Sequence, residues 1–393
     1  MPQKLSYREA IDEARTLQIR GLLRELPTAC ADFLRNISLQ TQVFTRLAYA
    51  MDMLTFFTFL HHERLAFADK PVVAYDDTDF DRLSLRDVES YVEYLTLYFK
   101  DEKGDGNEEH VRRFVNHDLS IKRKLSSLRA FYDYLFRTQR ISSNILQLVT
   151  LPRPKDKPIL MLSEEEMTRI LSLADSGESL TESQKHFHQK TSRRDYALLS
   201  LFLGTGIRVS ECVGLNLADV NLEEQAFIVT RKGGNQVMLY FPSEVGQALQ
   251  RYLELRETIE TLPGHEEAFF LSLQRRRMSV RAVQQLVKKY ASHAAPLKPR
   301  ISPHKLRSTY ATNLYNNTGD IYLVADALGH SSVDTTKRHY AQISAARRRL
   351  AAEATKLPHS VAELTDLRES SISHGVIQST DRNPKGHEEQ TDK

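Results

Sequence analysis

Apolar residues in the first 150 positions recur with the period of amphipathic helices. A strand-like alternation is not evident there, so we predict a small helical bundle. Ser84 and Ser120 stand where helix N-caps are expected, and residues 101–109, which include two glycines, are predicted to form a polar loop. The helical runs are Phe44, Leu47, Met51, Leu54, Phe57 and Leu60; Val88, Tyr91, Val92, Leu95 and Phe99; and Leu125, Leu128, Phe131 and Leu135.

A proline-rich segment separates this bundle from the rest of the chain. Residues 151–158, LPRPKDKP, consist of three prolines, four charged residues and one leucine. Proline disfavours helix both at its own position and at the residue before it, which is typical of a linker. We therefore predict an N-terminal helical domain at 1–150 with a leading helix at 1–25, and a linker at 151–160.

The region from 161 to 357 is predicted to be a mixed domain. Ser163 and Glu166 have the spacing of a capping box and indicate the start of a helix. Residues 176–194 are polar and are predicted to be an inserted loop before an apolar helix at 196–204. Two alternating apolar runs, 226–230 and 237–241, flank the turn KGGN and predict a β-hairpin. Helices follow to about 357, and residues 358–393 are predicted to be a disordered tail.

Composition narrows the classes of protein. Of the 393 residues, 41% are hydrophobic, yet we find no uninterrupted apolar run of the ~18 residues that a membrane span requires. The N-terminal segment lacks the apolar core of a signal peptide. The two cysteines, Cys30 and Cys212, lie far apart, which favours a reducing cytoplasm and excludes a disulfide framework or a thiolate zinc site.

Basic residues are concentrated in two segments, although the whole chain carries a formal net charge of only +3. Residues 271–350 contain fifteen lysines and arginines against three aspartates, a local charge of 15 − 3 = +12, and residues 111–140 are also strongly basic. Such segregation is typical of a polyanion partner, with ordinary solvated helix faces as the alternative. The candidate contacts are Arg112, Arg113, Lys122, Arg123, Lys124, Arg129, Arg275, Arg276, Arg277, Arg281 and Lys305.

Four short motifs in the second domain carry candidate chemistry. They are GTGIRVSE at 204–211 with Arg208 and Glu211, RKGG at 231–234 with Lys232, PHKLR at 303–307 with His304 and Arg307, and the run from LGH at 328–330 to Tyr340. The i, i+3 spacing places His304 and Arg307 on one helical face. Taken alone, each motif has another explanation: an Arg208–Glu211 ion pair, a solvated turn lysine, zinc-binding histidines or a packing tyrosine.

In this order the four motifs resemble the signature of the tyrosine recombinases, the phage-integrase family. The resemblance runs from about 162 to 343, and the N-terminal half is similar to the core-binding domain of that family. The TRKGG hairpin, the PHKLR box and the one-piece N-terminal domain are most similar to Xer-type recombinases that act alone. The fold implied is mainly α with a small β-hairpin, a two-domain C-shaped DNA clamp made of a helical core-binding domain and an α+β catalytic domain.

The resemblance implies a role for each motif residue. Arg208 and Arg307 would clamp the scissile phosphate, because a guanidinium fork matches two phosphate oxygens. Tyr340 would be the nucleophile, Lys232 the general acid and His304 the proton acceptor, while His330 would bind the phosphate and Glu211 would support Arg208. The separation of His330 and Tyr340, ten residues, is one more than is usual, but no other tyrosine follows the LGH box. Neither metal nor cofactor is expected.

The resemblance also implies partners. We expect double-stranded DNA with a specific recombination site and a homotetramer that forms on it, with the helix at 344–357 packed on a neighbouring protomer or closing its own domain. Resolution of chromosome dimers and integration or excision of a mobile element are both compatible with the sequence. The alternatives are a type IB topoisomerase, which would use the same groups to relax DNA, and a non-catalytic DNA-binding protein on this scaffold.

Overall fold

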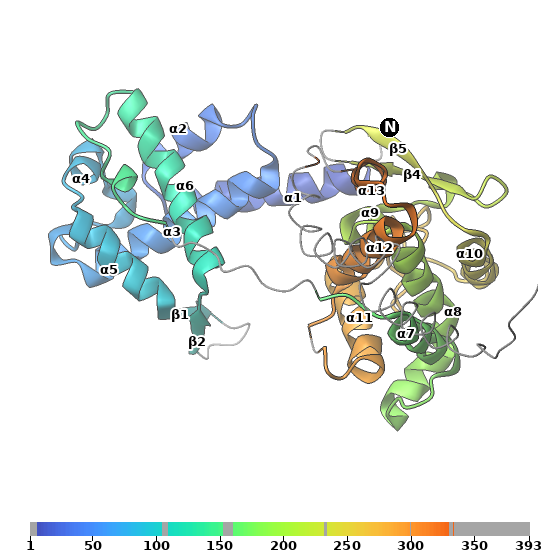
Figure 1. Ribbon diagram of the computed structural model, residues 1–393. Helices are drawn as coiled ribbons and strands as arrows, with labels where there is room; N and C mark the ends of the chain where they lie inside the picture. The colour runs from blue at the N-terminus through green and yellow to red at the C-terminus, as the bar shows by residue number, and fades with distance from the viewer. Residues whose placement is uncertain are drawn as a thin grey trace, which may run out of the picture. The chain divides into compact units, whose positions relative to one another are not determined.

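The computed structural model describes residues 6–103, 109–151, 160–231, 234–298, 300–329 and 333, with the side chains of 100–112 excepted. The chain divides into two compact units, Met1–Pro158 and Ile159–Lys393 (Figure 1). Each unit has its own apolar interior, so each is described by itself. The described part of the chain is mainly helical, with one small antiparallel sheet in each unit, which confirms the predicted fold class at the level of secondary structure.

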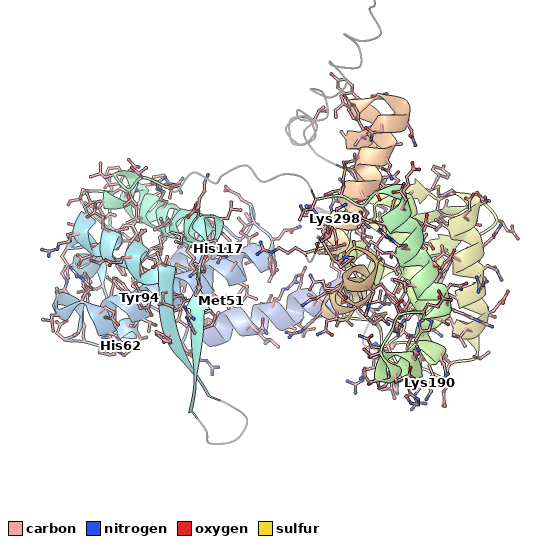
Figure 2. All side chains as sticks on the ribbon, turned by 60° about the horizontal axis from the view of Figure 1, so that its bottom comes forward. Met51, His62, Tyr94, His117, Lys190 and Lys298 are labelled. Carbon is pink, nitrogen blue, oxygen red and sulfur yellow. The ribbon has the colours of Figure 1, made fainter. Side chains whose placement is uncertain are left out.

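Helices build most of the first unit. Ser84 caps α5 through a capping box with Asp87, as predicted, whereas Ser120 lies inside α6, which begins at Asp118 after His117 (Figure 2). The predicted cap at Ser120 is therefore wrong. The elements are α1 Tyr7–Leu22, α2 Thr28–Asn36, α3 Val43–Glu63, η1 Leu65–Phe67, η2 Val72–Ala74, α4 Asp77–Asp81, α5 Leu85–Thr96, β1 Leu97–Lys103, β2 Glu109–Val115, α6 Asp118–Arg137 and η3 Ile145–Gln147.

The long helix α3 runs through the centre of this unit. Within the described residues it is the helix that is long and apolar enough to cross a membrane by length and composition alone. Its apolar side chains instead fill the interior of the unit: Phe56 and Phe57 are fully buried, and Phe57 meets the ring of Phe131 on α6 at 6.1 Å between centroids. A buried core helix can match a membrane-spanning helix in length and composition. The burial of its apolar surface, at ~25 cal/mol per Å², stabilises it inside the unit.

A buried carboxylate joins α3 to the basic helix α6. Asp52, which is 1% exposed, accepts two hydrogen bonds from the Arg123 guanidinium at 2.5 and 2.6 Å and one from the Lys124 ammonium at 3.3 Å. The Ser127 hydroxyl donates a further bond to it at 3.1 Å. A buried carboxylate is tolerated because its charge and lone pairs are satisfied in this way.

We expect Asp52→Ala to lower the free energy of unfolding by about 3 kcal/mol, because the change leaves the half-buried cation Lys124 without its counter-charge. Urea unfolding followed by circular dichroism measures the loss. Asp32→Ala is the matched control, since Asp32 forms 3.3 Å pairs with Arg35 and Arg140 at the surface and should cost less than about 1 kcal/mol. Equal losses in the two variants would contradict the role assigned to burial.

A β-hairpin in the first unit corrects the prediction of an all-helical domain. Strands β1 and β2 pair antiparallel, with Leu97 opposite Val115 and Tyr98 opposite Phe114. The predicted helix over 88–99 therefore ends at Thr96, and residues 101–103 and 109 of the predicted loop belong to strands. The Tyr98 and Phe114 rings stack at 5.1 Å on one face. Neighbouring aromatic and β-branched residues favour such pairing over a last helical turn.

The second unit places helices around a three-stranded antiparallel sheet of order β3-β4-β5. The predicted hairpin is confirmed, with Ala226 opposite Tyr240 and Thr230 opposite Gln236, and Ser163 caps α7 with Glu166 as predicted. The elements are α7 Glu164–Ser176, α8 Glu182–Thr205, α9 Val209–Gly214, η4 Leu217–Asp219, β3 Val220–Asn221, β4 Ala226–Thr230, β5 Gln236–Tyr240, α10 Ser243–Glu257, α11 Val280–Ala294, α12 Pro303–Thr318 and α13 Ile321–Leu328.

Helix α8 begins much earlier than predicted. The segment predicted as an inserted loop, 176–194, forms the first half of this helix from Glu182 onward, where Lys190 lies (Figure 2). Its polar side chains made it look like a loop, but several of them are buried. Asp195, 1% exposed, accepts hydrogen bonds from Thr191 at 3.0 Å, from Arg194 at 2.7 Å and from Tyr290 of α11 at 2.8 Å. A satisfied polar network therefore replaces the apolar stripe that sequence periodicity detects.

Candidate active site

The link between α8 and α9 positions Arg208. Gly206 ends α8 in the left-handed conformation, with φ +61°, and its N–H donates to the Phe202 carbonyl at 3.0 Å. Glycine is favoured there because other residues pay a steric penalty at positive φ. The added Cβ of any other residue would lie 2.4 Å from Cδ1 of the Tyr310 ring. The chain then turns directly into α9, with Arg208 in extended conformation at the N-cap position.

Glu211 fixes the Arg208 guanidinium. The Arg208 N–H donates to the Glu211 carboxylate at 3.0 Å, and its Nη1 donates to the other oxygen at 2.7 Å. The carboxylate side chain is 6% exposed and that of Arg208 is 36% exposed, so one end of the guanidinium is anchored while the side chain still reaches solvent. A residue that supports Arg208 would have this arrangement.

Arg307 is the fifth residue of α12, which begins at Pro303. It is 7% exposed and donates through Nη1 to the Gly206 carbonyl at 2.5 Å and through Nη2 to the Leu328 carbonyl. Burial, followed by the charge of Arg208, lowers the pKa of Arg307 to about 10. The guanidinium is therefore fixed by backbone oxygens in a place where burial makes its positive charge unfavourable.

The C-terminal end of α13 is where the arginines meet. The Arg208 Nη2 donates to the carbonyls of Leu328 and Gly329 at 3.1 and 3.0 Å, and Arg307 also donates to Leu328. The last carbonyls of a helix have no partner within the helix and form its negative end, so they attract cations. They hold the two guanidinium groups in fixed orientations, close to each other.

Sequence reasoning missed a third arginine at this place. Arg231, at the end of β4, donates through Nη2 to the Ala327 carbonyl at 3.2 Å, one residue before the carbonyls that bind Arg208 and Arg307. Its position directly before the predicted general acid Lys232 was a signal that could have found it. In this motif a role was assigned from the sequence to Lys232 alone.

The remaining predicted site residues are distributed as follows. His304 is exposed and lies on α12 three residues before Arg307, so the two share one helical face, as the PHKLR spacing predicts. Lys232, His330 and Tyr340 lie outside the described residues, as do the helix predicted at 344–357 and the predicted tail. Of the residues predicted to be catalytic or supporting, the structure therefore describes Arg208, Glu211, His304 and Arg307.

The predicted polyanion contacts fall into two groups. Several of them have strong partners within the protein: Arg277 donates to the carbonyls of Val213 and Leu215 at 3.0 and 2.8 Å, Arg129 donates to the Leu146 carbonyl at 2.9 Å, and Arg123 and Lys124 bind Asp52. Those side chains stabilise the fold. Of the others, Arg113, Arg275, Arg276 and Arg281 are exposed, Lys122 and Lys305 are half-buried, and the Arg112 side chain lies outside the described residues. Arg123 is exposed as well as bonded to Asp52.

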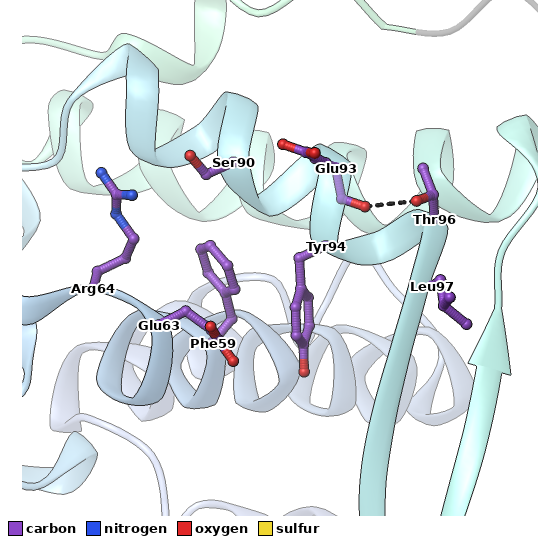
Figure 3. A pocket seen from close by; sticks show the side chains of 8 residues that line it. All are labelled: Phe59, Glu63, Arg64, Ser90, Glu93, Tyr94, Thr96 and Leu97. Atoms are coloured by element: carbon purple, nitrogen blue, oxygen red, sulfur yellow. Dashed lines mark hydrogen bonds between the residues drawn. The ribbon is translucent and has the colours of Figure 1, made fainter.

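Two surface hollows are lined by residues other than those of the arginine cluster. One, in the first unit, lies between α3 and α5, where Phe59, Glu63, Glu93 and Tyr94 line it (Figure 3). Within the described residues, no group of histidine, cysteine, aspartate and glutamate has the arrangement of a metal site.

We expect Gly206→Ala to destabilise the second unit by about 2 kcal/mol, because alanine is strained at this φ and its methyl would collide with Tyr310. Thermal unfolding measures the effect. Gly264→Ala is the matched control: Gly264 has φ +87° but nothing within 4 Å of an added Cβ, so only the conformational cost of about 1 kcal/mol applies. Equal losses of stability in the two variants would mean that the collision with Tyr310 does not contribute to the destabilisation.

Comparison with known proteins agrees with this geometry. Residues 161–347 match the model of the phage integrase family. The tyrosine recombinase XerC of Caldanaerobacter subterraneus subsp. tengcongensis is 33% identical over 297 residues, which cover 74% of this chain and 75% of that protein. The tyrosine recombinase XerS of Lactococcus lactis subsp. cremoris is 31% identical over 315 residues, 74% of this chain and 85% of that protein.

Solved structures share the fold. The XerH site-specific recombinase, in a post-cleavage complex with a palindromic difH substrate, aligns with a TM-score of 0.56 at 17% identity and covers 90% of this chain and 97% of that one. The Tn1549 transposon integrase, in complex with a circular intermediate DNA, aligns with a TM-score of 0.55 at 21% identity and covers 82% and 99%. At these identities the likeness concerns the fold.

The chain belongs to the phage integrase family of tyrosine recombinases. It is a site-specific tyrosine recombinase, an enzyme that cuts and rejoins DNA strands, and among curated proteins it is similar to recombinases of the Xer type. The two alternatives considered from the sequence, a topoisomerase and a non-catalytic DNA-binding protein, are not favoured.

Proposed function

We propose that Arg208 and Arg307 bind the phosphate at which this recombinase cuts its DNA. The observation that carries the proposal is the convergence of both guanidinium groups on the Leu328 carbonyl. A phosphodiester under attack gains charge on its non-bridging oxygens, and guanidinium groups that are already oriented stabilise that charge without reorganising. Glu211 keeps Arg208 oriented while the phosphate is absent and after it has left.

The other predicted residues complete the reaction in this proposal. The Tyr340 oxygen forms a bond to phosphorus while the bond from phosphorus to the 5′-oxygen of the next nucleotide breaks, and the strand is left attached through a 3′-phosphotyrosine. The phenol proton passes to His304, and Lys232 gives a proton to the departing 5′-oxygen, while His330 binds a phosphate oxygen. Attack by a 5′-hydroxyl of another strand reverses these steps and reseals the DNA, so neither nucleotide hydrolysis nor a metal is required.

The proposed partner is double-stranded DNA that carries a specific recombination site. We propose that both units contact the same duplex, as the clamp prediction requires, and that four protomers assemble on two sites, with the helix at 344–357 linking neighbours. The protein would act in the cytoplasm, where its two cysteines stay reduced. Similarity to XerC and XerS favours resolution of chromosome dimers over integration or excision of a mobile element.

Covalent capture on a DNA library tests this function and identifies the recombination site in the same experiment. The protein is incubated with nicked duplexes of randomised sequence, in which a short strand end diffuses away after cleavage and prevents resealing. The mixture is denatured, and the DNA that remains attached to protein is sequenced. We expect one enriched site with two inverted halves. DNA that binds but is never captured would refute the catalytic proposal, and relaxation of supercoiled plasmids without such a site would indicate a topoisomerase.

A further inference from the structure

We infer that Arg231 is a third phosphate-binding residue, which acts together with Arg208 and Arg307 on the scissile phosphate. The inference deepens the proposed function and rests on it. It concerns an arginine that neither the motif analysis nor the proposed mechanism uses, and it stands on the position of this guanidinium at the end of α13.

The backbone of Arg231 is fixed at the end of the β4–β5 hairpin. Its N–H donates to the Asn235 carbonyl at 2.8 Å, and its carbonyl accepts from the Gly234 N–H at 3.1 Å. These two bonds close the turn, so the start of the side chain has a defined position on the sheet. The turn includes Lys232 in sequence, which connects the third arginine directly to the predicted general acid.

The side chain of Arg231 is fixed at its other end by α13. Besides its 3.2 Å bond to Ala327, the guanidinium covers Gly329, where the chain leaves the helix with φ +59°. A Cβ built on Gly329 would lie 2.0 Å from Nη1 and 2.2 Å from Cζ of Arg231. Only glycine leaves room for a guanidinium in this place, and both ends of Arg231 are therefore held.

Three guanidinium groups thus bind three consecutive carbonyls. Arg231 donates to Ala327, Arg307 to Leu328, and Arg208 to Leu328 and Gly329. Burial is the main cause that lowers the pKa of Arg307, and the charges of Arg208 and Arg231 lower it further, while Glu211 raises it. The three cations are therefore close enough to repel each other.

The repulsion distinguishes an anion site from a simple helix cap. A helix C-terminus carries about half a negative charge and is stabilised by one cation, whereas each further cation brought to it adds a like-charge penalty. Three buried or half-buried guanidinium groups at one helix end are explained by a ligand with negative charge that binds all of them. A phosphodiester, with two non-bridging oxygens and a leaving oxygen, fits three such groups.

Cleavage of charged and neutral scissile phosphates tests the inference. Wild type, Arg231→Gln and Arg231→Lys are compared on the captured duplex and on the same duplex with a methylphosphonate at the cleaved position, which lacks the negative charge. We expect Arg231→Gln to cleave the phosphodiester roughly ten- to a hundredfold more slowly than wild type. On one methylphosphonate diastereomer the deficit should shrink to about threefold, because less charge needs to be neutralised, and Arg231→Lys should lie between.

Arg251→Gln is the matched control. Arg251 lies on α10 of the same unit, where its exposed side chain pairs with the exposed Asp175 at 3.3 Å, and its loss should leave both substrates unaffected. The melting temperature of each variant is measured to check folding. An Arg231→Gln deficit of equal size on both substrates would mean that Arg231 only caps α13 and would overturn the inference, as would cleavage at the wild-type rate.

Inorganic phosphate separates this inference from the proposed function. Orthophosphate, compared with chloride at equal ionic strength, should raise the melting temperature of wild type and of Arg251→Gln by more than that of Arg231→Gln. If wild type never forms a covalent complex, the proposed mechanism fails, and the phosphate shift still decides whether Arg231 belongs to an anion site. An equal shift in all three proteins would overturn the inference by itself.

Discussion

Tyr340→Phe is expected to abolish the covalent protein–DNA complex while DNA binding persists. The change removes one hydroxyl, which is the proposed nucleophile, so cleavage should fall by at least about 10⁴-fold. Binding depends mainly on the basic side chains that contact the DNA backbone and should change less than about twofold. Denaturing electrophoresis of the captured, nicked duplex measures the first quantity, and a gel-shift titration measures the second.

Tyr322→Phe is the matched control for the nucleophile. Tyr322 lies on α13 and is 65% exposed, so the loss of its hydroxyl should leave the covalent complex unchanged. A covalent band that persists in Tyr340→Phe and disappears in another tyrosine variant would transfer the nucleophile to that residue. Complementation is informative as well: a mixture of Tyr340→Phe with an Arg307→Ala variant would recover cleavage only if a tetramer builds its sites from two subunits.

Arg307→Ala should lower cleavage by at least about 10³-fold with little loss of stability. The folded-state pKa of Arg307 lies below its ordinary value, so keeping this side chain charged destabilises the fold at every pH below about 10. Removing the charge relieves that cost and offsets the hydrogen bonds that are lost. Stability and function are thus opposed at this residue, as is common in active sites. Single-turnover cleavage and thermal unfolding, measured on the same preparation, check both parts.

Arg256→Ala is the control for Arg307→Ala, and we expect it to lower stability without lowering cleavage. Arg256 is another buried arginine of the second unit, and it donates to the carbonyls of Ala268 and Glu266 at 3.0 and 2.7 Å, away from the cluster at α13. We expect its loss to cost about 3 kcal/mol of stability and to leave cleavage per folded molecule unchanged. If Arg307→Ala behaved in the same way, Arg307 would be a structural residue and the phosphate clamp would be wrong.

The parts of the fold that were predictable are those with a strong local signal. Alternation on either side of a glycine turn located the hairpin at 226–241, and the serine–glutamate spacing located the start of α7. The first half of α8 was not predictable in this way, because Thr191, Arg194 and Asp195 are buried by pairing with one another and with Tyr290 on a distant helix. The start of strand β1 was likewise assigned to the preceding helix and its end to a loop, since its partner β2 is beyond the reach of a periodicity argument.

The site was predictable to the extent that its residues belong to recognisable motifs. Arg208, Glu211 and Arg307 come from two such motifs, and the structure brings them together at α13. Arg231 is different, because its place is defined by the fold: the hairpin brings it to Ala327, ninety-six positions away. Glycine at 329 then leaves room for the guanidinium. Neither requirement is visible in the residues next to Arg231.

The two cysteines give each half of the chain its own reporter. Cys30 lies in the first unit and Cys212 in the second, both are fully buried, and burial raises the pKa of each thiol well above its ordinary value. Native thiols of this kind do not react with alkylating reagents, and each becomes reactive only when its surroundings open. Timed alkylation followed by peptide mass spectrometry can therefore follow the opening of the two halves separately, and a single new surface cysteine would accept a fluorophore without competition from either native thiol.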